Sequence, residues 1–379
     1  MIPLPRRLRI AIFTTGRFHV CDLARELAAL DHDVRFYSLV PPWRTRKFGL
    51  PDRCNRWLLP WVAPWFAAAK AAQQTRLRHW ADQKLAEALD RAGAWAVEPC
   101  DVFIGMSGMC NRVAAAVRRK FGAKIWIERG SRHILSQKAI LDAIPGADRV
   151  PDYAVQRELT DYAQADTVVV LSRHCEQSFL DYGYPAEKLL RNPLGVNLNM
   201  FTPTSAPLAD PPTVIMAGGW SLRKGSDVLI EAWRQLPDTC LVHVGPTLDC
   251  PLPLDARFTH HDTVDQPRLR ELYAMAQVFA LASREEGLAT VIPQALACGL
   301  RVVCTTRTGG EDLKDFIADP TAIRVVPPDD PTALADALRL ALADARNDSG
   351  LRDRLGAGRE SLSWGACARR YNKALQERV

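Results

Sequence analysis

Short apolar and β-branched runs alternate with helix-length amphipathic stretches along most of the chain, and this alternation restricts the fold more than any other feature. The pattern is typical of βαβ units, in which helices cover both faces of a parallel sheet. Helices are predicted, for example, at Val20 to Leu30 and at Asp152 to Gln164. The predicted strands are Arg9 to Phe13, Val34 to Tyr37, Val102 to Gly105, Lys124 to Glu128, Thr167 to Leu171, Leu189 to Arg191, Val214 to Ala217, Leu241 to Val244, Val278 to Leu281, Arg301 to Thr305 and Ile323 to Val326.

A proline-rich stretch from Thr202 to Pro212 interrupts the alternation and is the predicted linker. The length of 379 residues also exceeds the roughly 250 to 300 residues at which a single hydrophobic core stops growing. We therefore expect an α/β fold of two Rossmann-like, doubly wound domains, residues 1–205 and 206–363, facing a central cleft. Residues 364–379 contain an amphipathic helix, Trp364 to Glu377, expected by analogy to cross back to the first domain.

Charge is distributed unevenly between the two predicted domains. Residues 1–205 hold 29 basic and 20 acidic side chains, a net charge of +9, whereas the remaining residues hold 20 and 23, a net charge of −3. A basic domain beside a nearly neutral one indicates an anionic partner for the first domain, such as a lipid surface or an acidic acceptor. No recognised nucleic-acid-binding motif accompanies this charge, so a nucleic-acid partner is not expected.

The ten cysteines are scattered from Cys21 to Cys367, without C-x-x-C spacing or a histidine at metal-ligand spacing. We therefore expect reduced, mostly buried thiols and no metal site. Near the N-terminus, the apolar run from Ile10 to Phe13 is too short for the hydrophobic region of a signal peptide. These features predict a cytoplasmic protein, with the inner face of the membrane as a second location to consider.

The loop after the first predicted strand, Thr14 to His19, argues against a dinucleotide cofactor. It holds a single glycine, Gly16, and lacks the G-x-G-x-x-G pattern of NAD-binding domains. Two interpretations of Gly16 stay open: it allows a substrate to approach the backbone closely, or it only permits a tight turn.

The strongest functional pattern is S-R-E-E-G-L-A-T-V-I-P-Q-A-L-A-C-G, from Ser283 to Gly299, which follows the predicted strand Val278 to Leu281. A strand here ends in a polar, glycine-containing turn and continues into a helix. The N–H groups at a helix start lack intrahelical acceptors and carry the positive end of the helix dipole. The amides near Ala289, Thr290 and Val291 are therefore predicted to hold a diphosphate.

A second pattern, G-G-W-S-L-R-K-G, from Gly218 to Gly225, directly follows the predicted strand Val214 to Ala217. Together the two segments resemble the donor-binding signature of the family 4 retaining glycosyltransferases, which reads E-G-F-G-x-x-x-x-E-A-x-A-x-G. The resemblance extends from about Asn192 to about Pro331. Weaker matches add to it at Pro193 to Phe201, Val244 to Pro246 and Thr308 to Leu313.

The resemblance assigns roles to individual residues on the donor side. Glu286 aligns with the glutamate that faces the hydroxyls of the donor sugar, and Lys224 with the lysine that neutralises the diphosphate. Gln294 stands where the family has a ribose-binding glutamate, and an amide offers one acceptor oxygen where a carboxylate offers two charged ones. The other predicted donor-site residues are Gly219, Arg223, Gly245, Gly287, Leu288, Ala289 and Thr290, with Gly309, Gly310 and Glu311 near the donor sugar or phosphates.

Several positions depart from the family pattern. Leu288 replaces the phenylalanine, Ala289 replaces the second glycine, and Pro293 directly precedes Gln294. Trp220 stands in place of an arginine next to the glycine turn, so Arg223 is the candidate for the second cation. For Lys224 a solvated lysine, and for Glu286 a simple helix cap, are the structural alternatives.

Acceptor-side residues are predicted in the first domain, where the segment Ile125 to His133 ends a strand in polar residues facing the expected cleft. His133 is a catalytic candidate because some family members place a histidine or an acidic residue near the sugar and the acceptor. Glu128 and Arg129 are acceptor-side candidates, against the alternative of an ion pair of Glu128 with Arg129 or Arg132. Gly16, Arg17 and His19 join them at the first loop.

Basic residues and tryptophans also cluster between Trp43 and Arg78. This composition suits the headgroup region of a membrane, where cationic and amphipathic side chains are both satisfied. The apolar part, Trp57 to Ala69, has two prolines and falls short of the roughly 20 residues needed to span a bilayer. Contact with an anionic membrane surface and a helix packed over the first domain both stay open. The clustered residues are Arg44, Arg46, Lys47, Arg53, Arg56, Trp57, Trp61, Trp65 and Phe66.

The resemblance implies a GT-B fold and transfer of a hexose from a UDP- or GDP-sugar to a saccharide or lipid-linked acceptor. It further implies retention of configuration, no cofactor, no metal ion, and a place in bacterial polysaccharide or glycoconjugate synthesis. Two alternatives remain: a sugar-nucleotide epimerase or phosphorylase on the same fold, and a non-catalytic protein that binds a true transferase. The base, the sugar, the acceptor and the linkage are not specified by the sequence.

Overall fold

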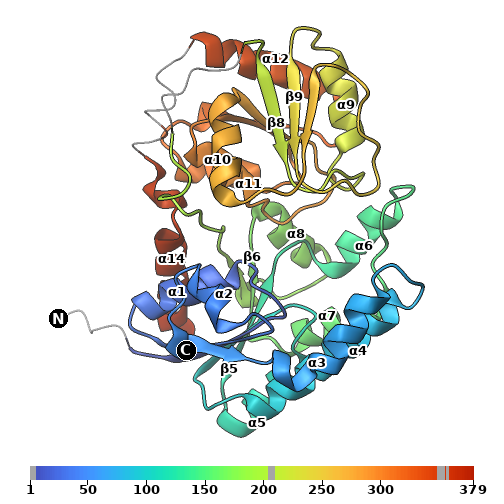
Figure 1. Ribbon diagram of the computed structural model, residues 1–379. Helices are drawn as coiled ribbons and strands as arrows, with labels where there is room; N and C mark the ends of the chain where they lie inside the picture. Colours follow the sequence, from blue (N-terminus) through green and yellow to red (C-terminus); the bar gives the residue numbers. More distant parts are fainter. Residues whose placement is uncertain (1–5, 204–209, 348–354, 356–357) are drawn as a thin grey trace, which may run out of the picture.

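The computed structural model describes residues 6–203, 210–347, 355 and 358–379, and it shows two α/β domains stacked on one another (Figure 1). Each domain is built on one parallel sheet with helices on both faces. This confirms the prediction of two doubly wound domains. The predicted linker, Thr202 to Pro212, lies partly outside the described residues.

The N-terminal sheet has seven parallel strands in the order β3-β2-β1-β4-β5-β6-β7. The central strand β4 consists of apolar residues that are all buried, as expected for a sheet covered on both faces. The strands are β1 (Arg9–Phe13), β2 (Asp33–Ser38), β3 (Asn55–Trp57), β4 (Val102–Met106), β5 (Lys124–Arg129), β6 (Thr167–Val170) and β7 (Leu189–Arg191).

Helices divide the N-terminal core into two layers. Side chains of α4, α5 and α7 pack on one face of the sheet, and side chains of α1 pack on the other. The helices are α1 (Val20–Ala29), α2 (Pro42–Arg46), α3 (Leu59–Ala72), α4 (Arg78–Ala96), α5 (Asn111–Phe121), α6 (Ile134–Asp142), α7 (Asp152–Gln164) and α8 (Arg173–Asp181), with short 3₁₀ turns at Asp52–Cys54 and Ala186–Lys188.

The C-terminal sheet has six parallel strands in the order β10-β9-β8-β11-β12-β13 around a single large core. The strands are β8 (Thr213–Ala217), β9 (Cys240–Val244), β10 (Phe258–His261), β11 (Val278–Leu281), β12 (Arg301–Thr305) and β13 (Ile323–Val326). The helices are α9 (Ser226–Arg234), α10 (Gln266–Met275), α11 (Val291–Ala297) and α12 (Pro331–Asn347), with 3₁₀ turns at Gly310–Phe316, Pro320–Ala322 and Arg359–Leu362.

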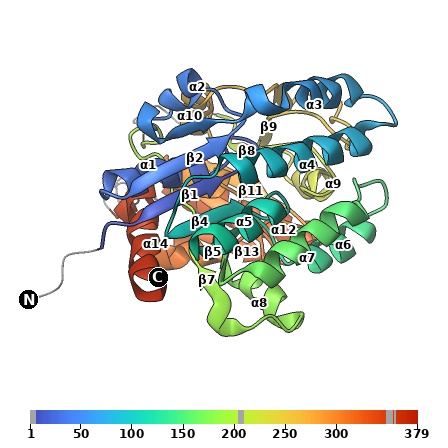
Figure 2. The same cartoon turned by 90° about the horizontal axis from the view of Figure 1, so that it is seen from below.

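The last helix, α14 (Trp364–Arg378), packs against the N-terminal domain beside α1, and the two lie next to each other in both views (Figures 1 and 2). The ring of Tyr371 lies 5.2 Å from that of Trp126, and Ala368 and Leu375 are buried in the same apolar cluster. Helix α14 therefore completes the layer that α1 begins, although the whole C-terminal domain separates the two in sequence.

Every predicted strand is present within one residue of its predicted bounds, and the sequence missed two others. Strand β3 has only three residues, all half-buried, at the edge of its sheet. Strand β10 reads Phe-Thr-His-His and has no apolar run. Both are edge strands, where one side faces no further strand and the apolar pattern used to find strands is weak.

Candidate functional site

The loop after β8, residues 218–225, brings two cations to the edge of the C-terminal sheet. Gly218 (φ 125°) and Gly225 (φ 65°) adopt backbone conformations that favour glycine. A side chain on Gly225 would collide with the carbonyl oxygen of Ala282, at the end of β11. Close packing of the two loops thus requires a glycine and sets Lys224 beside the segment that follows β11.

Four charged residues meet there, and we call Arg223, Lys224, Glu285 and Glu286 the charged cluster. The Lys224 ammonium forms an ion pair with the Glu286 carboxylate. The Arg223 guanidinium lies 3.1 Å from Glu285 Oε2 and 3.6 Å from Glu286 Oε1. Two cations and two carboxylates balance, so the unliganded cluster carries no net charge. An anionic ligand would have to replace carboxylates as the partner of these cations.

Arg223 and Glu285 are held in their ionised forms. The charge of Glu286 raises the pKa of Arg223 above its ordinary value, against the opposing effect of burial. Burial raises the pKa of Glu285, but the hydrogen bond from Ser131 and the charge of Arg223 together bring that pKa below its ordinary value. Both groups of this pair are therefore charged at neutral pH.

Arg284 fixes the position of the segment that carries the two glutamates. Its guanidinium donates to both oxygens of Asp227, at 2.7 and 2.8 Å, and to Asp329 at 2.5 Å. Its backbone N–H donates to the carbonyl of Arg223 at 2.9 Å. The loops after β8 and β11 are thus joined by main-chain and side-chain bonds, as a preorganised site requires.

Loops of the N-terminal domain sit directly on residues 285–287. Glu285, which is fully buried, accepts hydrogen bonds from Ser131 Oγ and, at 3.1 Å, from Gln137 Nε2. Ser172 Oγ donates to the carbonyl of Gly287 at 2.8 Å. A side chain on Gly287 would collide with the carbonyl oxygen of Gly130, so the two main chains touch here. The charged cluster lies where the carboxyl ends of both sheets meet.

His174, at the start of α8, adds a further interdomain contact. Its Nε2 lies 2.8 Å from the carbonyl oxygen of Glu286, and its Nδ1 lies 3.0 Å from Ser172 Oγ. Burial lowers the pKa of His174 to about 4, so the ring is neutral and its Nε2 donates the bond to the carbonyl. This contact positions the main chain on which Glu286 stands.

Helix α11 differs in part from its prediction. The N–H of Ala289 donates to the carbonyl of Thr308 at 3.2 Å, so this amide is not available to a ligand, contrary to expectation. Leu288 and Ala289 are buried, whereas Thr290 is exposed. The Oε1 atom of Gln294 is buried without a hydrogen-bond partner among the described residues. An unsatisfied buried acceptor suits a position that a ligand hydroxyl would occupy.

Trp220 is a core residue. It is fully buried, its indole N–H donates to the carbonyl of Pro251 at 3.1 Å, and its ring packs 4.7 Å from the ring of His243. Nitrogen Nε2 of His243 in turn lies 2.8 Å from the carbonyl oxygen of Gly218. Trp220 therefore packs beneath the glycine turn through its contact with His243. The second cation of the loop is Arg223.

Glycines allow close contacts between neighbouring loops of the site. Gly245 (φ 143°) lies against the carbonyl of Gly218, and a side chain there would collide with it. At Gly219 a side chain would meet only the flexible end of Leu248. Gly309 (φ 73°) lies against the carbonyl of Gly287. Two contacts between loops thus leave no room for side chains: Gly245 against Gly218, and Gly309 against Gly287.

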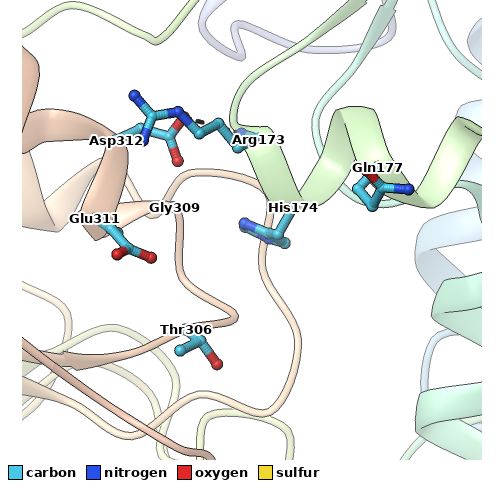
Figure 3. Close-up of a pocket in the computed structure, with 7 residues that line it drawn as sticks. All are labelled: Arg173, His174, Gln177, Thr306, Gly309, Glu311 and Asp312. Carbon is cyan, nitrogen blue, oxygen red and sulfur yellow. Dashed lines mark hydrogen bonds and ion pairs between the residues drawn. The ribbon is translucent and has the colours of Figure 1, made fainter.

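A cavity of about 320 Å³ opens between α8 and the loop after β12. In Figure 3, Arg173 and His174 come from α8, and Thr306, Gly309, Glu311 and Asp312 face them from the C-terminal domain. The buried Asp312 accepts a hydrogen bond of 2.9 Å from the N–H of Arg173. A second cavity of about 600 Å³ lies between α6 and the C-terminal domain. Its lining combines apolar residues such as Ile140 and Leu222 with the charged Arg132, Arg284 and Arg307.

On the N-terminal side, His19 and Glu128 form a pair. His19 Nε2 lies 3.0 Å from Glu128 Oε2, which joins the first loop to the end of β5. Arg17 turns away to Asp22, at 2.8 Å, and its guanidinium lies 3.7 Å from the centre of the Phe48 ring. Gly16 is half-buried beside them. The structure thus brings His19 and Glu128 together and leaves Arg17 with another partner.

Arg129 is bound by side chains of its own domain. Arg129 is buried and lies 2.9 Å from Glu158, and it also donates to Gln137 at 2.7 Å. The alternative of a Glu128 pair with Arg129 is therefore wrong. Gln137 in turn binds Glu285, so Arg129 acts on the charged cluster through one intermediate side chain.

His133 caps α6 and is enclosed by aromatic rings. Its Nδ1 accepts a hydrogen bond from Leu135 N at 3.3 Å, and its ring stacks on Tyr182 at 4.6 Å. Phe179 and Tyr162 lie at 4.9 and 5.2 Å. Burial, followed by the charge of Arg129, lowers the pKa of His133 to about 4. These contacts favour a structural role over the predicted catalytic one, which remains an untested prediction.

The residues of the site that were not predicted are Arg284, Glu285, Ser131, Gln137, Ser172 and His174. Glu285 directly precedes a predicted residue, but its partners lie about 150 positions away, at sequence separations of 154 and 148. No local pattern marks Ser131, Gln137 or His174. Within the described residues, no group of three or more His, Cys, Asp or Glu side chains is placed to hold a metal ion.

Residues 211–344 match the family model described as Glycosyl transferases group 1. A D-inositol 3-phosphate glycosyltransferase of Xylanimonas cellulosilytica is 32% identical over 247 residues, which are 58% of this chain and 58% of that protein. A GDP-mannose-dependent alpha-(1-6)-phosphatidylinositol monomannoside mannosyltransferase of Mycolicibacterium smegmatis is 31% identical over 210 residues, which are 48% and 54% of the two chains. The chain thus spans little more than half the length of these relatives.

Solved structures match over nearly the whole chain. Sucrose-phosphate synthase from Thermosynechococcus elongatus aligns with a TM-score of 0.69 at 22% identity, covering 98% of this chain and 99% of that one. Anabaena HepE in complex with UDP-glucose aligns with a TM-score of 0.65 at 14% identity, covering 98% and 100%. This likeness establishes the fold and confirms the predicted GT-B type. The chain therefore has a two-domain GT-B fold, and residues 211–344 of its C-terminal domain match the Glycosyl transferases group 1 model.

Proposed function

We propose that this protein is a glycosyltransferase that transfers a hexose from a UDP- or GDP-sugar to a saccharide or lipid-linked acceptor. The observation that carries the proposal is the charged cluster. Lys224 and Arg223 stand on a preorganised loop at the carboxyl edge of the C-terminal sheet, inside the segment that matches the family model. Ligands of doubly wound domains bind at this edge.

The chemistry follows from the charges. A nucleoside diphosphate gains negative charge as it leaves the sugar, and fixed cations stabilise that charge more than they stabilise the ground state. On donor binding, the diphosphate replaces Glu286 as the partner of Lys224. The freed carboxylate then accepts hydrogen bonds from the hydroxyls of the donor sugar, and Gln294 Oε1, which lacks a partner, accepts one from the ribose.

Retention of configuration and independence of metal ions belong to the same proposal. The departing diphosphate takes the proton of the acceptor hydroxyl, so no side-chain nucleophile is required, and the cations of the cluster serve in place of a metal. NMR of the product anomer formed from an α-linked donor tests the first point. Full activity after treatment with EDTA tests the second, and loss of activity that Mg²⁺ or Mn²⁺ restores would refute it.

The relatives narrow the acceptor classes worth testing. Their names specify an inositol phosphate and a mannosylated phosphatidylinositol as acceptors of those proteins. We accordingly propose a polar acceptor that carries a phosphate or a lipid, in bacterial polysaccharide or glycoconjugate synthesis and on the cytoplasmic side of the membrane. His19 and Glu128 are the acceptor-side pair.

A donor screen on the purified protein tests the proposal directly. Thermal-shift measurements with UDP, GDP and their glucose, mannose and N-acetylglucosamine derivatives should show stabilisation by one nucleotide class. Labelled donor with candidate acceptors should then give a glycosylated product. Lys224→Ala should reduce the stabilisation and lower the rate of product formation about 10²- to 10³-fold. The absence of stabilisation by every nucleotide would contradict donor binding.

One observation favours a second candidate, a non-catalytic partner protein: both cations are already paired and the N-terminal loops cover residues 285–287. Nucleotide stabilisation without transfer to any acceptor would support it. Incubation with a labelled donor and no acceptor addresses the remaining alternatives, since free epimer would indicate an epimerase and sugar phosphate formed with added phosphate would indicate a phosphorylase.

A further inference from the structure

Helices α3 and α4 form a hairpin on the outside of the N-terminal domain, and the charged cluster does not involve it (Figure 1). We call residues 59–96 the α3–α4 hairpin. Helix α3 has 14 residues and is almost entirely apolar, yet only Val62 and Ala69 are buried. Its composition is that of a core helix, but most of its surface has no protein partner among the described residues.

Tryptophans concentrate on this part of the molecule. All the tryptophans that are exposed lie between Trp43 and Trp95, whereas Trp126, Trp220, Trp233 and Trp364 are buried. Trp61 is 59% exposed, Trp80 51% and Trp95 70%, and Leu77 at the hairpin turn is 61% exposed. Monomeric proteins rarely expose an apolar surface of this kind without a use for it.

The charges around the hairpin have one sign. No acidic residue occurs from Arg53 to Ala81, whereas basic side chains stand on both sides of α3 and at the hairpin turn. Lys70, Arg76 and Arg78 are all exposed. The first acidic side chain after the turn, Asp82, lies 4.0 Å from Arg78. Among the described residues, neither Lys70 nor Arg76 forms an ion pair with a carboxylate.

We propose that the α3–α4 hairpin docks the protein onto a bilayer that contains anionic phospholipid. Helix α3 lies in the plane of the membrane, with Trp61 and Trp65 in the headgroup region and the cations on the lipid phosphates. Its length is about 21 Å at 1.5 Å per residue, short of the roughly 30 Å hydrocarbon core, so it does not cross. No described helix is long and apolar enough to do so.

Charge complementarity favours lipid over a second protein as the occupant. Tryptophan and tyrosine concentrate at membrane interfaces because one part of the ring is apolar and the other is polar. Basic residues near an anionic membrane surface each contribute on the order of 1 kcal/mol. Residues 53–81 combine tryptophan, alanine and cations and hold no carboxylate, so they meet both requirements. This proposal does not depend on the enzymatic activity proposed above.

Flotation of the full chain with vesicles tests the proposal. Vesicles of phosphatidylcholine alone are compared with vesicles that also contain phosphatidylglycerol. We expect binding only to the anionic vesicles, weakened by salt. Arg76→Ser with Arg78→Ser should weaken binding about 25-fold, since 1 kcal/mol for each basic residue corresponds to about fivefold. Trp61→Ser with Trp65→Ser should also release the protein.

Matched controls lie on the C-terminal domain. Leu340 on α12 is an exposed leucine, and Arg346 is an exposed arginine in the last turn of the same helix. Leu340→Ser and Arg346→Ser should leave vesicle binding unchanged. Because Trp61 contacts Trp95 at 4.8 Å, each hairpin variant is also checked for an unaltered melting temperature, and the arginine variants report on the proposal even if the tryptophan variants unfold.

Three outcomes would overturn the proposal. The first is the absence of binding to anionic vesicles, and the second is binding that the hairpin substitutions leave unchanged. The third is a dimer, detected by light scattering, that the tryptophan substitutions dissociate, which would make the hairpin a contact between two copies. Blue-shifted tryptophan fluorescence with anionic vesicles, lost in Trp61→Ser with Trp65→Ser, would support insertion.

Discussion

The two sides of the interdomain contact differ in chemistry. The C-terminal side presents two cations and two carboxylates within one charged cluster. The N-terminal side presents the neutral groups Ser131, Gln137, Ser172 and His174, which bind the carboxylate of Glu285 and the main chain of residues 286 and 287. The difference separates two tasks. In the proposed function the C-terminal side exchanges partners with an anionic ligand, whereas the N-terminal side holds the loop in place.

Lys224→Ala should have the largest effect and tests the task of the C-terminal side. Loss of a group that stabilises developing charge typically costs about 10²- to 10³-fold in kcat. Steady-state turnover with the donor found by screening measures the effect. Lys373→Ala, an exposed lysine on α14, is the matched control. Turnover of Lys224→Ala within a few-fold of the parent would remove the charged cluster from the mechanism.

Glu285→Ala should have the next largest effect because Glu285 has partners in both domains. Breaking a fully buried ion pair costs about 3 to 5 kcal/mol, and we expect about 2 kcal/mol here because Arg223 is partly exposed. Calorimetric or urea unfolding measures the loss. Glu286→Ala is the comparison, because among the described residues the Glu286 carboxylate pairs only with cations of its own domain. An equal loss in both variants would show that Glu285 does not join the domains.

Acid should weaken the fold through buried histidines on both sides of the contact. Burial lowers the pKa of His133, His174 and His243 from 6.5 to about 4. The unfolded chain therefore binds more protons between these values, and stability falls as the pH drops from 6.5 towards 4, by on the order of 1 to 2 kcal/mol for each ring. Above pH 6.5 these rings contribute no pH dependence.

The free energy of unfolding, measured at several pH values, checks this expectation. His174→Gln retains an N–H donor for the carbonyl of Glu286 but does not titrate, so the slope between pH 6.5 and 4 should decrease. His79→Gln changes an exposed ring and should leave the slope unaltered. An unchanged slope in His174→Gln would mean that the His174 ring is hydrated in the folded protein and does not have the lowered pKa that burial causes.

Gln294→Glu should have the smallest effect and sharpens the description of the C-terminal side. A carboxylate restores two charged acceptor oxygens for ribose hydroxyls, so affinity for the nucleoside diphosphate should be preserved or rise a few-fold. Isothermal titration with the preferred nucleotide measures it, and Gln235→Glu on the exposed surface controls for added charge. A large loss of affinity would place the ribose elsewhere.

The sequence predicted the sheet architecture and the residues of the charged cluster that lie in two short patterns. Strands such as β4 and β11 are continuous apolar runs, and Lys224 and Glu286 stand at fixed positions in glycine-containing turns. The amide of Ala289 was predicted as free, because only its own helix was considered. Its acceptor, the carbonyl of Thr308, comes from the next loop in the sheet.

Contacts between the domains could not be predicted either, because the partners are distant in sequence. Ser131 and Glu285 are 154 positions apart, and nothing local to either residue indicates the other. His133 was expected in the cleft because it follows a strand, but its ring turns into an aromatic cluster formed with α7 and α8. Trp220 replaces a cation in the pattern, and only the structure shows that it packs beneath the glycine turn.

The return of α14 to the first domain has a consequence for synthesis. The ribosome makes residues 364–378 only after the entire C-terminal domain, yet Tyr371 and Leu375 cover the apolar layer around Trp126. Until then that layer stays open to water or to a chaperone. The N-terminal domain is therefore translated first but completed last. Its exposed apolar layer is open to aggregation until α14 has been synthesised and has packed against it.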